Sequence, residues 1–261
     1  MFPEFLKYPR TRHLEGSRLQ PGDHDLSAEP FSVLRDQFVV VEEKLDGANS
    51  ALSFDASGKL WLQSRGHFLG GGFRERHFDL LKRWATAHQA ALFERLGERY
   101  VVYGEWLYAK HTVFYDALPH YFLEFDVFDR QLRRFLSTAR RRELLSGTVV
   151  QQVPVLFEGT LKSNEQLLSF LGRSRFKSAA WKSVLESAAA EKDVPLERAW
   201  KETDRSDEME GLYVKVETAD ETIGRYKWVR AGFLSAVADS ESHWQSRTIV
   251  PNRLAPGVVL P

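Results

Sequence analysis

The sequence predicts an α+β fold in which antiparallel sheets are flanked by helices. Short strand-like runs occur in clusters along the 261 residues, helical segments stand between the clusters, and no regular alternation of one strand with one helix is present. A hydrophobic content of 43% in a chain of this length supports a sizeable core. Together these observations favour a single large domain that covers residues 1–261.

The amino-terminal part contains the clearest local signals. Residues 1–35 are rich in proline and glycine and predict an irregular lead-in. A β-branched run at 38–41 predicts the first strand, and the runs 51–54 and 60–62 flank an Asp-Ala-Ser-Gly turn, which predicts a hairpin. Apolar residues at helical spacing over 74–96 predict a helix, and the glycine that follows is a suitable end for it.

The carboxy-terminal part combines further strands with shorter helices. Ser163 followed by Gln166 is a capping-box signal for a short helix, and helical spacing then covers about 178–190. Residues 231–261 predict a short tail that is too small for a second core. Four more strands are expected at 100–106, 121–128, 211–217 and 223–229.

Composition and charge exclude several classes of protein. Lysine plus arginine and aspartate plus glutamate number 36 each, so the net charge is zero and any nucleic-acid binding needs a local basic site. The absence of cysteine excludes a disulfide framework, a thiol nucleophile and cysteine-ligated metals. No apolar run approaches the roughly 18 residues of a membrane span and no signal-peptide core is present, which predicts a cytoplasmic protein without a membrane partner.

The residues that carry chemistry begin directly after the first expected strand. There Glu43-Lys44-Leu45-Asp46-Gly47-Ala48-Asn49 leaves the strand into a turn, which holds the lysine at a fixed point. A lysine amine is nucleophilic only when neutral, which needs a pocket that lowers its pKa. Taken alone, Lys-x-Asp-Gly is also compatible with a surface lysine before a β-turn. Five fragments follow it, namely Ser64-Arg65-Gly66, Tyr103-Gly104-Glu105, Phe122-Leu123-Glu124-Phe125-Asp126, Glu210-Gly211-Leu212-Tyr213-Val214-Lys215 and Arg225-Tyr226-Lys227.

In this order the fragments resemble motifs I, Ia, III, IIIa, IV and V of the covalent nucleotidyltransferases, which comprise DNA ligases, RNA ligases and mRNA capping enzymes. The match runs from Lys44 to Lys227, about 70% of the chain. Asn49 resembles RNA ligases of the RNA ligase 2-like branch, because capping enzymes and many DNA ligases have arginine there. Two positions depart from the usual pattern. Asp46 stands where the duplex-sealing phage enzyme has histidine, although archaeal RNA ligases have aspartate, and Arg225 stands where motif V usually has lysine.

The resemblance implies an ATP-grasp-like nucleotidyltransferase domain with the activity of an ATP-dependent RNA ligase. In that chemistry Lys44 attacks the α-phosphorus of ATP, AMP passes to a 5′-phosphate RNA end, and a 3′-hydroxyl then displaces AMP. Lys215 and Lys227 are expected to balance phosphate charge and to lower the pKa of Lys44. The resemblance implies catalytic roles for Lys44, Asp46, Glu210 and Lys227, contact with Mg²⁺ or Mn²⁺ for Glu210 and Asp46, and cofactor binding by Glu43, Lys44, Leu45, Asn49, Arg65, Glu105, Phe125, Lys215, Arg225 and Lys227.

Other functions stay open at this point. A DNA-end ligase or a capping-type guanylyltransferase normally has an oligonucleotide-binding-fold domain of ~80 or more residues after motif V, and residues 228–261 are too few for one. A non-catalytic nucleic-acid binder with the same fold is disfavoured by the intact motif residues. RNA ends are the expected partner, and a partner protein or an end-healing enzyme could supply a missing polynucleotide clamp. Arg140-Arg141-Arg142 could bind RNA phosphates, although a solvated helix start is the more common role of such a run.

Overall fold

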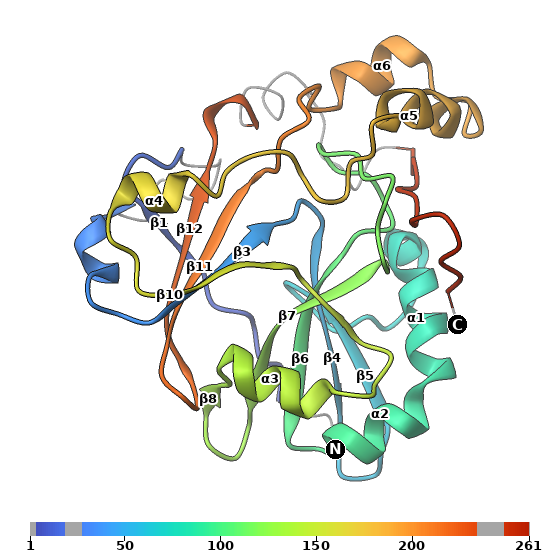
Figure 1. The fold of residues 1–261 in the computed structure, drawn as a ribbon. Helices are drawn as coiled ribbons and strands as arrows, with labels where there is room; N and C mark the ends of the chain where they lie inside the picture. The colour runs from blue at the N-terminus through green and yellow to red at the C-terminus, as the bar shows by residue number, and fades with distance from the viewer. Residues whose placement is uncertain (1–3, 19–27, 234–247, 261) are drawn as a thin grey trace.

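Two sheets form the centre of the fold (Figure 1). The structure is a computed structural model that describes residues 4–18, 28–233 and 248–260. The first sheet has the order β10 (Val155–Gly159), β3 (Val39–Lys44), β11 (Gly211–Glu217), β12 (Thr222–Val229), β1 (Arg12–Leu14) and β2 (Ala28–Glu29). The second has the order β5 (Leu60–Ser64), β4 (Ala48–Phe54), β6 (Tyr100–Trp106), β7 (Phe122–Asp129) and β8 (Arg134–Phe135), and β9 (Gln151–Gln152) pairs with β7.

Most neighbouring strands are antiparallel, which confirms the predicted α+β class. The parallel pairs are β1 with β12, β1 with β2, and β7 with β9. Strand β3 ends at Lys44 in the first sheet, and β4 begins at Ala48 in the second. The turn 45–47 therefore carries the chain from one sheet to the other, so the most chemically suggestive motif lies where the two sheets are joined.

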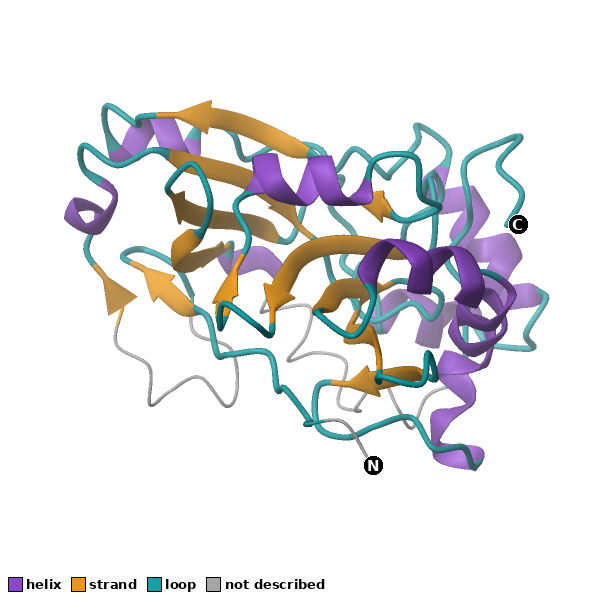
Figure 2. Cartoon of the chain, turned by 90° about the horizontal axis from the view of Figure 1, so that it is seen from below, coloured by secondary structure: helices purple, strands orange, loops and turns teal. Residues whose placement is uncertain are grey.

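The helices lie around the two sheets (Figure 2). Helices α1 and α2 contact β5 and β4 of the second sheet, while α5 and α6 pack against each other at one end of the molecule (Figure 1). Among the described residues, no helix has both the length and the apolar character needed to cross a membrane. The helical elements are η1 (Phe31–Leu34), η2 (Phe73–Phe78), α1 (Asp79–Ala87), α2 (Gln89–Leu96), α3 (Thr138–Leu145), α4 (Asn164–Leu168), α5 (Trp181–Ala190) and α6 (Leu196–Lys201).

Two predicted regions differ from the structure. The helix expected over 74–96 starts as a 3-10 turn and is interrupted at His88, yet its predicted apolar face is buried in the core at Leu81, Ala85 and Leu92. The lead-in expected to be irregular contributes β1, β2 and η1. Strands β1 and β2 are three and two residues long, so β1 depends on its pairing with β12, and β2 on its pairing with β1, rather than on a local sequence period.

Candidate active site

A cavity of about 690 Å³ is lined by residues of both sheets at the point where β3 ends. Its walls include the end of β3, the turn 45–47, the start of β4, and parts of β6, β7, β11 and β12. A volume of this size is within the range of small-molecule and cofactor sites. Ten of the residues expected in the site line it, namely Glu43, Lys44, Leu45, Asp46, Asn49, Arg65, Glu105, Phe125, Glu210 and Lys227.

The amine of Lys44 lies in this cavity against a carboxylate. Its Nζ is 2.8 Å from Oε2 of Glu210. The contact follows from strand pairing, because Lys44 on β3 is the register partner of Gly211, the residue after Glu210. Motifs I and IV, which are 166 positions apart in sequence, are thereby joined through adjacent antiparallel strands.

The turn after Lys44 is held by a dense set of hydrogen bonds. The backbone N–H of Asp46 donates to the Tyr115 hydroxyl at 2.9 Å, and that of Gly47 donates to Oε1 of Glu105 at 3.0 Å. A Cβ at Gly47 would lie 2.7 Å from the backbone oxygen of Trp106, so the close approach of the turn to β6 requires glycine. The turn that presents Lys44 is therefore a rigid part of the site.

Asp46 contacts the segment of the chain between β6 and β7. Its Oδ2 accepts the backbone N–H groups of Thr112 and Val113, both at 2.7 Å. His111 lies close to the other oxygen, with Nδ1 3.9 Å from Oδ1. The Asp46 carboxylate is thus oriented by backbone donors, and one of its oxygens is already engaged.

The electrostatics around Lys44 favour its charged form. Burial opposes the charge of the amine, but the carboxylates of Glu210, Glu105 and Asp46 outweigh burial and raise the pKa of Lys44 above its usual value. The expected net decrease of the Lys44 pKa is therefore not found, because the three carboxylates outweigh the influences that lower it. The neighbouring carboxylates are affected in turn: burial raises the pKa of Glu105 to about 8 and that of Glu210 to about 7, and it also raises the pKa of Asp46.

Aromatic side chains form another wall of the cavity. Phe125 packs against Tyr8 with ring centroids 5.2 Å apart, and Tyr213 lies 6.3 Å from the same ring. The hydroxyls of Tyr8 and Tyr213 are 2.6 Å apart, and the Tyr8 hydroxyl also donates to Asp126. An apolar face closed by hydroxyl groups suits a planar heterocycle, such as a nucleotide base.

Comparison with known proteins agrees with this geometry. The family model described as RNA ligase matches residues 37–229, well over half of the chain. The chain belongs to the RNA ligase family. Among curated protein sequences no significant match is found.

Solved structures of a Naegleria gruberi RNA ligase have the same fold. A variant with ATP and Mn is matched with a TM-score of 0.58 and 17% identity over 91% of this chain and 59% of that one. A variant with AMP and Mn is matched with a TM-score of 0.56 and 17% identity over 91% of this chain and 60% of that one. The protein with PPi is matched with a TM-score of 0.54 and 18% identity, also over 91% of this chain and 60% of that one. This RNA ligase family member therefore spans about three fifths of the length of the Naegleria enzyme chains.

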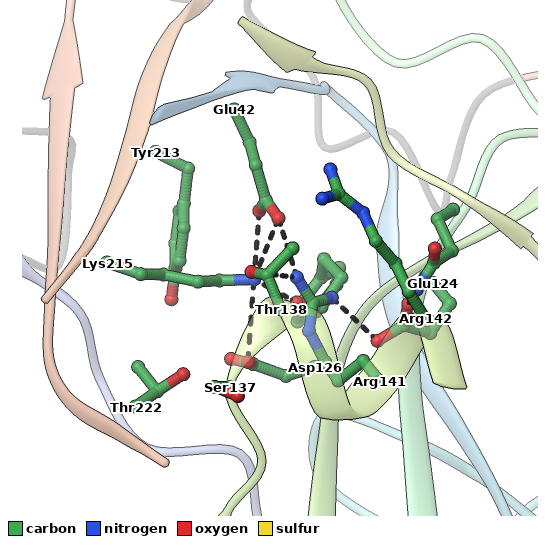
Figure 3. A network of polar contacts seen from close by, with 12 residues as sticks. Glu42, Glu124, Asp126, Ser137, Thr138, Arg141, Arg142, Tyr213, Lys215 and Thr222 are labelled. Carbon is green, nitrogen blue, oxygen red and sulfur yellow. Dashed lines mark hydrogen bonds and ion pairs between the residues drawn. The ribbon is translucent and has the colours of Figure 1, made fainter. Parts of the chain in front are cut away.

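Two cations expected to bind the nucleotide, Lys215 and Arg225, do not line the cavity. Lys215 is fully buried, lies 2.9 Å from Glu42 and 3.5 Å from Asp126, and donates to the backbone oxygen of Phe125 (Figure 3). Arg225 is 3.1 Å from Asp126 and its guanidinium stacks over the Phe135 ring at 3.6 Å. Both side chains therefore lie in the protein interior next to the aromatic wall of the cavity.

One expected residue lines the cavity without directing its carboxylate to the nucleotide site. Glu43 accepts the Ser174 hydroxyl at 2.6 Å and the backbone N–H of Arg175 at 3.2 Å. Burial raises the pKa of Glu43 despite these donors. Because side chains alternate along a strand, Glu42 and Lys44 share the opposite face of β3. The contribution of Glu43 to the cavity therefore comes from its backbone.

Sequence reasoning missed several lining residues. Tyr213 lies two positions after Gly211 on a predicted strand, so the alternation of side chains along that strand could have indicated that it faces the cavity. Tyr8 and Thr11 reach the cavity from the lead-in, where Thr11 lies 3.0 Å from the Tyr213 hydroxyl. No local pattern distinguishes these two residues, because their position depends on the path of the chain next to β12.

The site fits a divalent metal held mainly through water and phosphate oxygens. Among the described residues, no group of three or more His, Asp or Glu side chains is arranged to hold a metal ion directly. The carboxyl groups of Glu210, Glu105 and Asp46 nevertheless lie together beside Lys44, where each of them acts to raise the pKa of the amine. Mg²⁺ commonly uses one or two carboxylates with several retained waters, which this arrangement can provide through Glu210 and Asp46.

Proposed function

We propose that this member of the RNA ligase family is an ATP-dependent enzyme that joins 5′-phosphate and 3′-hydroxyl RNA ends through a lysyl-AMP intermediate on Lys44. The observation that carries the proposal is the position of the Lys44 amine, in a nucleotide-sized cavity and 2.8 Å from Glu210. Family membership supports RNA as the substrate, and the ATP, AMP and pyrophosphate in the Naegleria gruberi structures support the nucleotide.

In this proposal Lys44 is the nucleophile of the first step. Its neutral amine attacks the α-phosphorus of ATP, a nitrogen–phosphorus bond forms, the bond to the bridging oxygen breaks, and pyrophosphate leaves. The amine must first lose a proton, because the surrounding carboxylates raise its pKa. Glu210 is the acceptor in reach, since its carboxylate is in hydrogen-bond contact with the amine and burial raises its pKa to about 7.

The remaining cavity residues bind and orient the nucleotide. Arg65 and Lys227 contact phosphate oxygens, Glu105 accepts hydrogen bonds from the ribose hydroxyls, and Phe125 packs against adenine. A divalent metal such as Mg²⁺ or Mn²⁺, held through waters near the pocket carboxylates, supplies positive charge to the phosphates when bound.

The later steps transfer AMP and join the strands. An oxygen of the RNA 5′-phosphate attacks the phosphorus bound to Lys44, which releases the lysine and forms a pyrophosphate bond between RNA and AMP. The RNA 3′-hydroxyl then attacks the activated 5′-phosphate, forming the phosphodiester and releasing AMP. We assign these steps to residues 1–261 as one adenylyltransferase domain, with a partner protein or an end-healing enzyme supplying further grip on the RNA.

The test is incubation with labelled ATP or labelled GTP and Mg²⁺, followed by a denaturing gel. We expect ATP to label the chain through an acid-labile, alkali-stable bond. Lys44→Ala and Lys44→Arg should abolish labelling, because no neighbouring amine occupies the cavity position of Lys44. Lys162→Ala, an exposed lysine outside the cavity, is the matched control and should keep full labelling.

Sealing of nicked RNA by the same preparation tests the substrate. Joined product that depends on Lys44 and on a 5′-phosphate supports the full proposal. Labelling that persists in Lys44→Ala would contradict the nucleophile, and preferential labelling by GTP would contradict the nucleotide. Efficient sealing of nicked DNA without sealing of RNA would contradict the substrate.

A further inference from the structure

A balanced group of buried charges lies beside the cavity, and one of its members, Glu42, also lines it (Figure 3). It contains three acidic and three basic side chains, and they come from both sheets and from α3. Five of the six side chains are almost fully buried. We name these six residues the interior charge cluster: Glu42, Glu124, Asp126, Arg141, Lys215 and Arg225.

Arg141 contacts both sheets from helix α3. Its Nη1 donates to Oε1 of Glu124 at 2.8 Å, and its Nη2 donates to Oε1 of Glu42 at 2.8 Å and to the Thr138 hydroxyl at 2.9 Å. Figure 3 shows its side chain pointing from α3 into the cluster. The guanidinium is 1% exposed, so the more common role of an arginine run as a solvated helix start does not hold for Arg141.

The adjacent arginines of the run behave differently. Arg140 pairs with Asp220 at 2.8 Å and with Glu143 at 2.9 Å, and all three side chains are exposed. Arg142 pairs with Glu158 at 2.6 Å on the surface. Arg141 alone of the three faces the interior, which makes the other two matched references for it.

The two carboxylates held by Arg141 stand next to residues of the active site. Glu42 precedes Lys44 by two positions on β3, so both side chains lie on the same face of that strand. Glu124 directly precedes Phe125 on β7. Strands β3 and β7 belong to different sheets, so the guanidinium connects the strand of the nucleophile with the strand of the aromatic wall.

Lys215 strengthens the same connection from β11. Its ammonium lies 2.9 Å from Glu42 and donates to the backbone oxygen of Phe125. The planar fork of Arg141 defines angles as well as distances, whereas an ammonium acts as a point charge. Arg141 is therefore the member whose geometry can set the orientation of one strand relative to the other.

We propose that Arg141 is a positioning residue that sets the distance between the Lys44 strand and the Phe125 wall, and thereby tunes binding of the nucleotide base. The inference rests on the proposed function, because it assumes that the base packs against Phe125. It assigns Arg141 no contact with substrate. Its effect is on nucleotide affinity, because Lys44 and Glu210 sit on adjacent strands of the first sheet and keep their contact without it.

The first test is Arg141→Lys, with Arg142→Lys as control. Lysine keeps the charge but loses the fork, so we expect KM for ATP in self-adenylylation to rise about tenfold. The kcat, measured per active site by burst labelling, should stay within about threefold of the wild-type value. Arg142→Lys should change neither constant. An unchanged KM in folded Arg141→Lys would overturn the proposal.

A second variant separates positioning from stability. Buried ion pairs can often be replaced by neutral side chains without loss of stability. The double variant Arg141→Met, Glu124→Gln removes one basic and one acidic charge together, so it should melt closer to the wild type than Arg141→Met alone. Its KM for ATP should stay raised about tenfold, because neutral contacts do not define the strand spacing. A double variant with a wild-type KM would show that Arg141 is needed only to compensate charge.

A binding measurement keeps this inference distinct from the proposed function. The dissociation constant of a fluorescent ATP analogue requires no transfer chemistry, and it should rise about as much as KM in both Arg141 variants. A wild-type protein that binds the analogue but is not labelled would contradict lysyl-AMP formation, and the Arg141 comparison could still be completed by binding. A wild-type affinity in both Arg141 variants would overturn the positioning role.

Discussion

Two groups of carboxylates adjoin the same cavity and have opposite electrostatic characters. One group lies around Lys44, where burial raises the pKa of Glu105 to about 8 and that of Glu210 to about 7. The other is the interior charge cluster, where burial opposes ionisation of Asp126 but Lys215, Arg225 and Arg141 outweigh it and lower its pKa. Burial also raises the pKa of Glu124, so the contrast is sharpest at Asp126.

The two groups differ in how their carboxyl groups are stabilised. Burial raises the pKa values of Glu105 and Glu210, whereas neighbouring bases lower the pKa of Asp126 and stabilise its ionised form. The interior charge cluster contains equal numbers of acids and bases in direct contact, so it holds the sheets together without a ligand. Around Lys44 burial shifts Glu105 and Glu210 toward their neutral forms, and a bound cation would favour their ionised forms. Substitutions in the two groups should therefore affect different properties.

The largest effect is expected from breaking the interior charge cluster at Asp126. Asp126→Asn keeps the shape of the side chain but leaves Arg225, at 3.1 Å, and Lys215, at 3.5 Å, without their shared carboxylate. Loss of one partner from a buried pair costs about 3–5 kcal/mol. Urea unfolding should show this loss, while the exposed control Asp79→Asn should stay within about 0.5 kcal/mol of wild type. A loss of less than about 1 kcal/mol would show that the cluster is not a unit.

The next effect concerns catalysis by the group around Lys44. Glu210→Ala removes the carboxylate that contacts the Lys44 amine, and loss of such a group commonly lowers a rate by about 10² or more, or about 2.7 kcal/mol. Self-adenylylation should fall by this factor. The unfolding midpoint should stay close to that of wild type, because burial makes the ionised form of Glu210 unfavourable and its removal therefore costs little stability. Glu94→Ala, exposed on α2, is the control. Activity within tenfold of wild type would remove Glu210 from the proposed mechanism.

A smaller effect should follow from filling the space at the turn between the sheets. Gly47→Ala places a Cβ 2.7 Å from the Trp106 backbone oxygen and 2.8 Å from a methyl of Leu107. Overpacking of this kind costs about 2 kcal/mol. Gly66→Ala is the matched control, since its Cβ would meet no atom within 4 Å. Thermal melts that do not distinguish the two variants would contradict the rigid turn.

Much of the fold could be predicted from the sequence where the local period was strong. Strands β6 and β11 have the predicted bounds, and Ser163 caps the predicted helix, with its hydroxyl accepting the Gln166 N–H, although the Gln166 side chain accepts the N–H of Lys162 and not that of Ser163. Strands β1 and β2 were missed because they are too short to show a period and depend on parallel neighbours. Tertiary pairing, not propensity, determines such elements.

The candidate site divides in a similar way. Lys44, Glu105 and Glu210 could be placed together because motif order identifies them, although they are far apart in sequence. Lys215 could not be placed, because strand alternation gives the face of a residue but not how far along the strand the cavity extends. Arg141 could not be recognised either, since three consecutive arginines look alike until the helix orients them.

The smallest predicted effect tests the electrostatic contrast directly through pH. Burial raises the folded-state pKa of Glu105 to about 8, above the ordinary value of about 4.5 in the unfolded chain. Between these values the folded state binds more protons than the unfolded state, so this group makes stability fall as pH rises from about 5 to 8. Glu105→Gln removes the titration and can retain the hydrogen bond from the Gly47 N–H. Without nucleotide or metal, its advantage over wild type in urea unfolding should grow by about 1 kcal/mol between pH 6.5 and 7.5 and should level off above about pH 8.5. Asp126→Asn should show no such gain at high pH, because the lowered pKa of Asp126 makes its contribution complete there. A Glu105→Gln advantage that shrinks with rising pH would contradict a raised pKa of Glu105 in the folded protein.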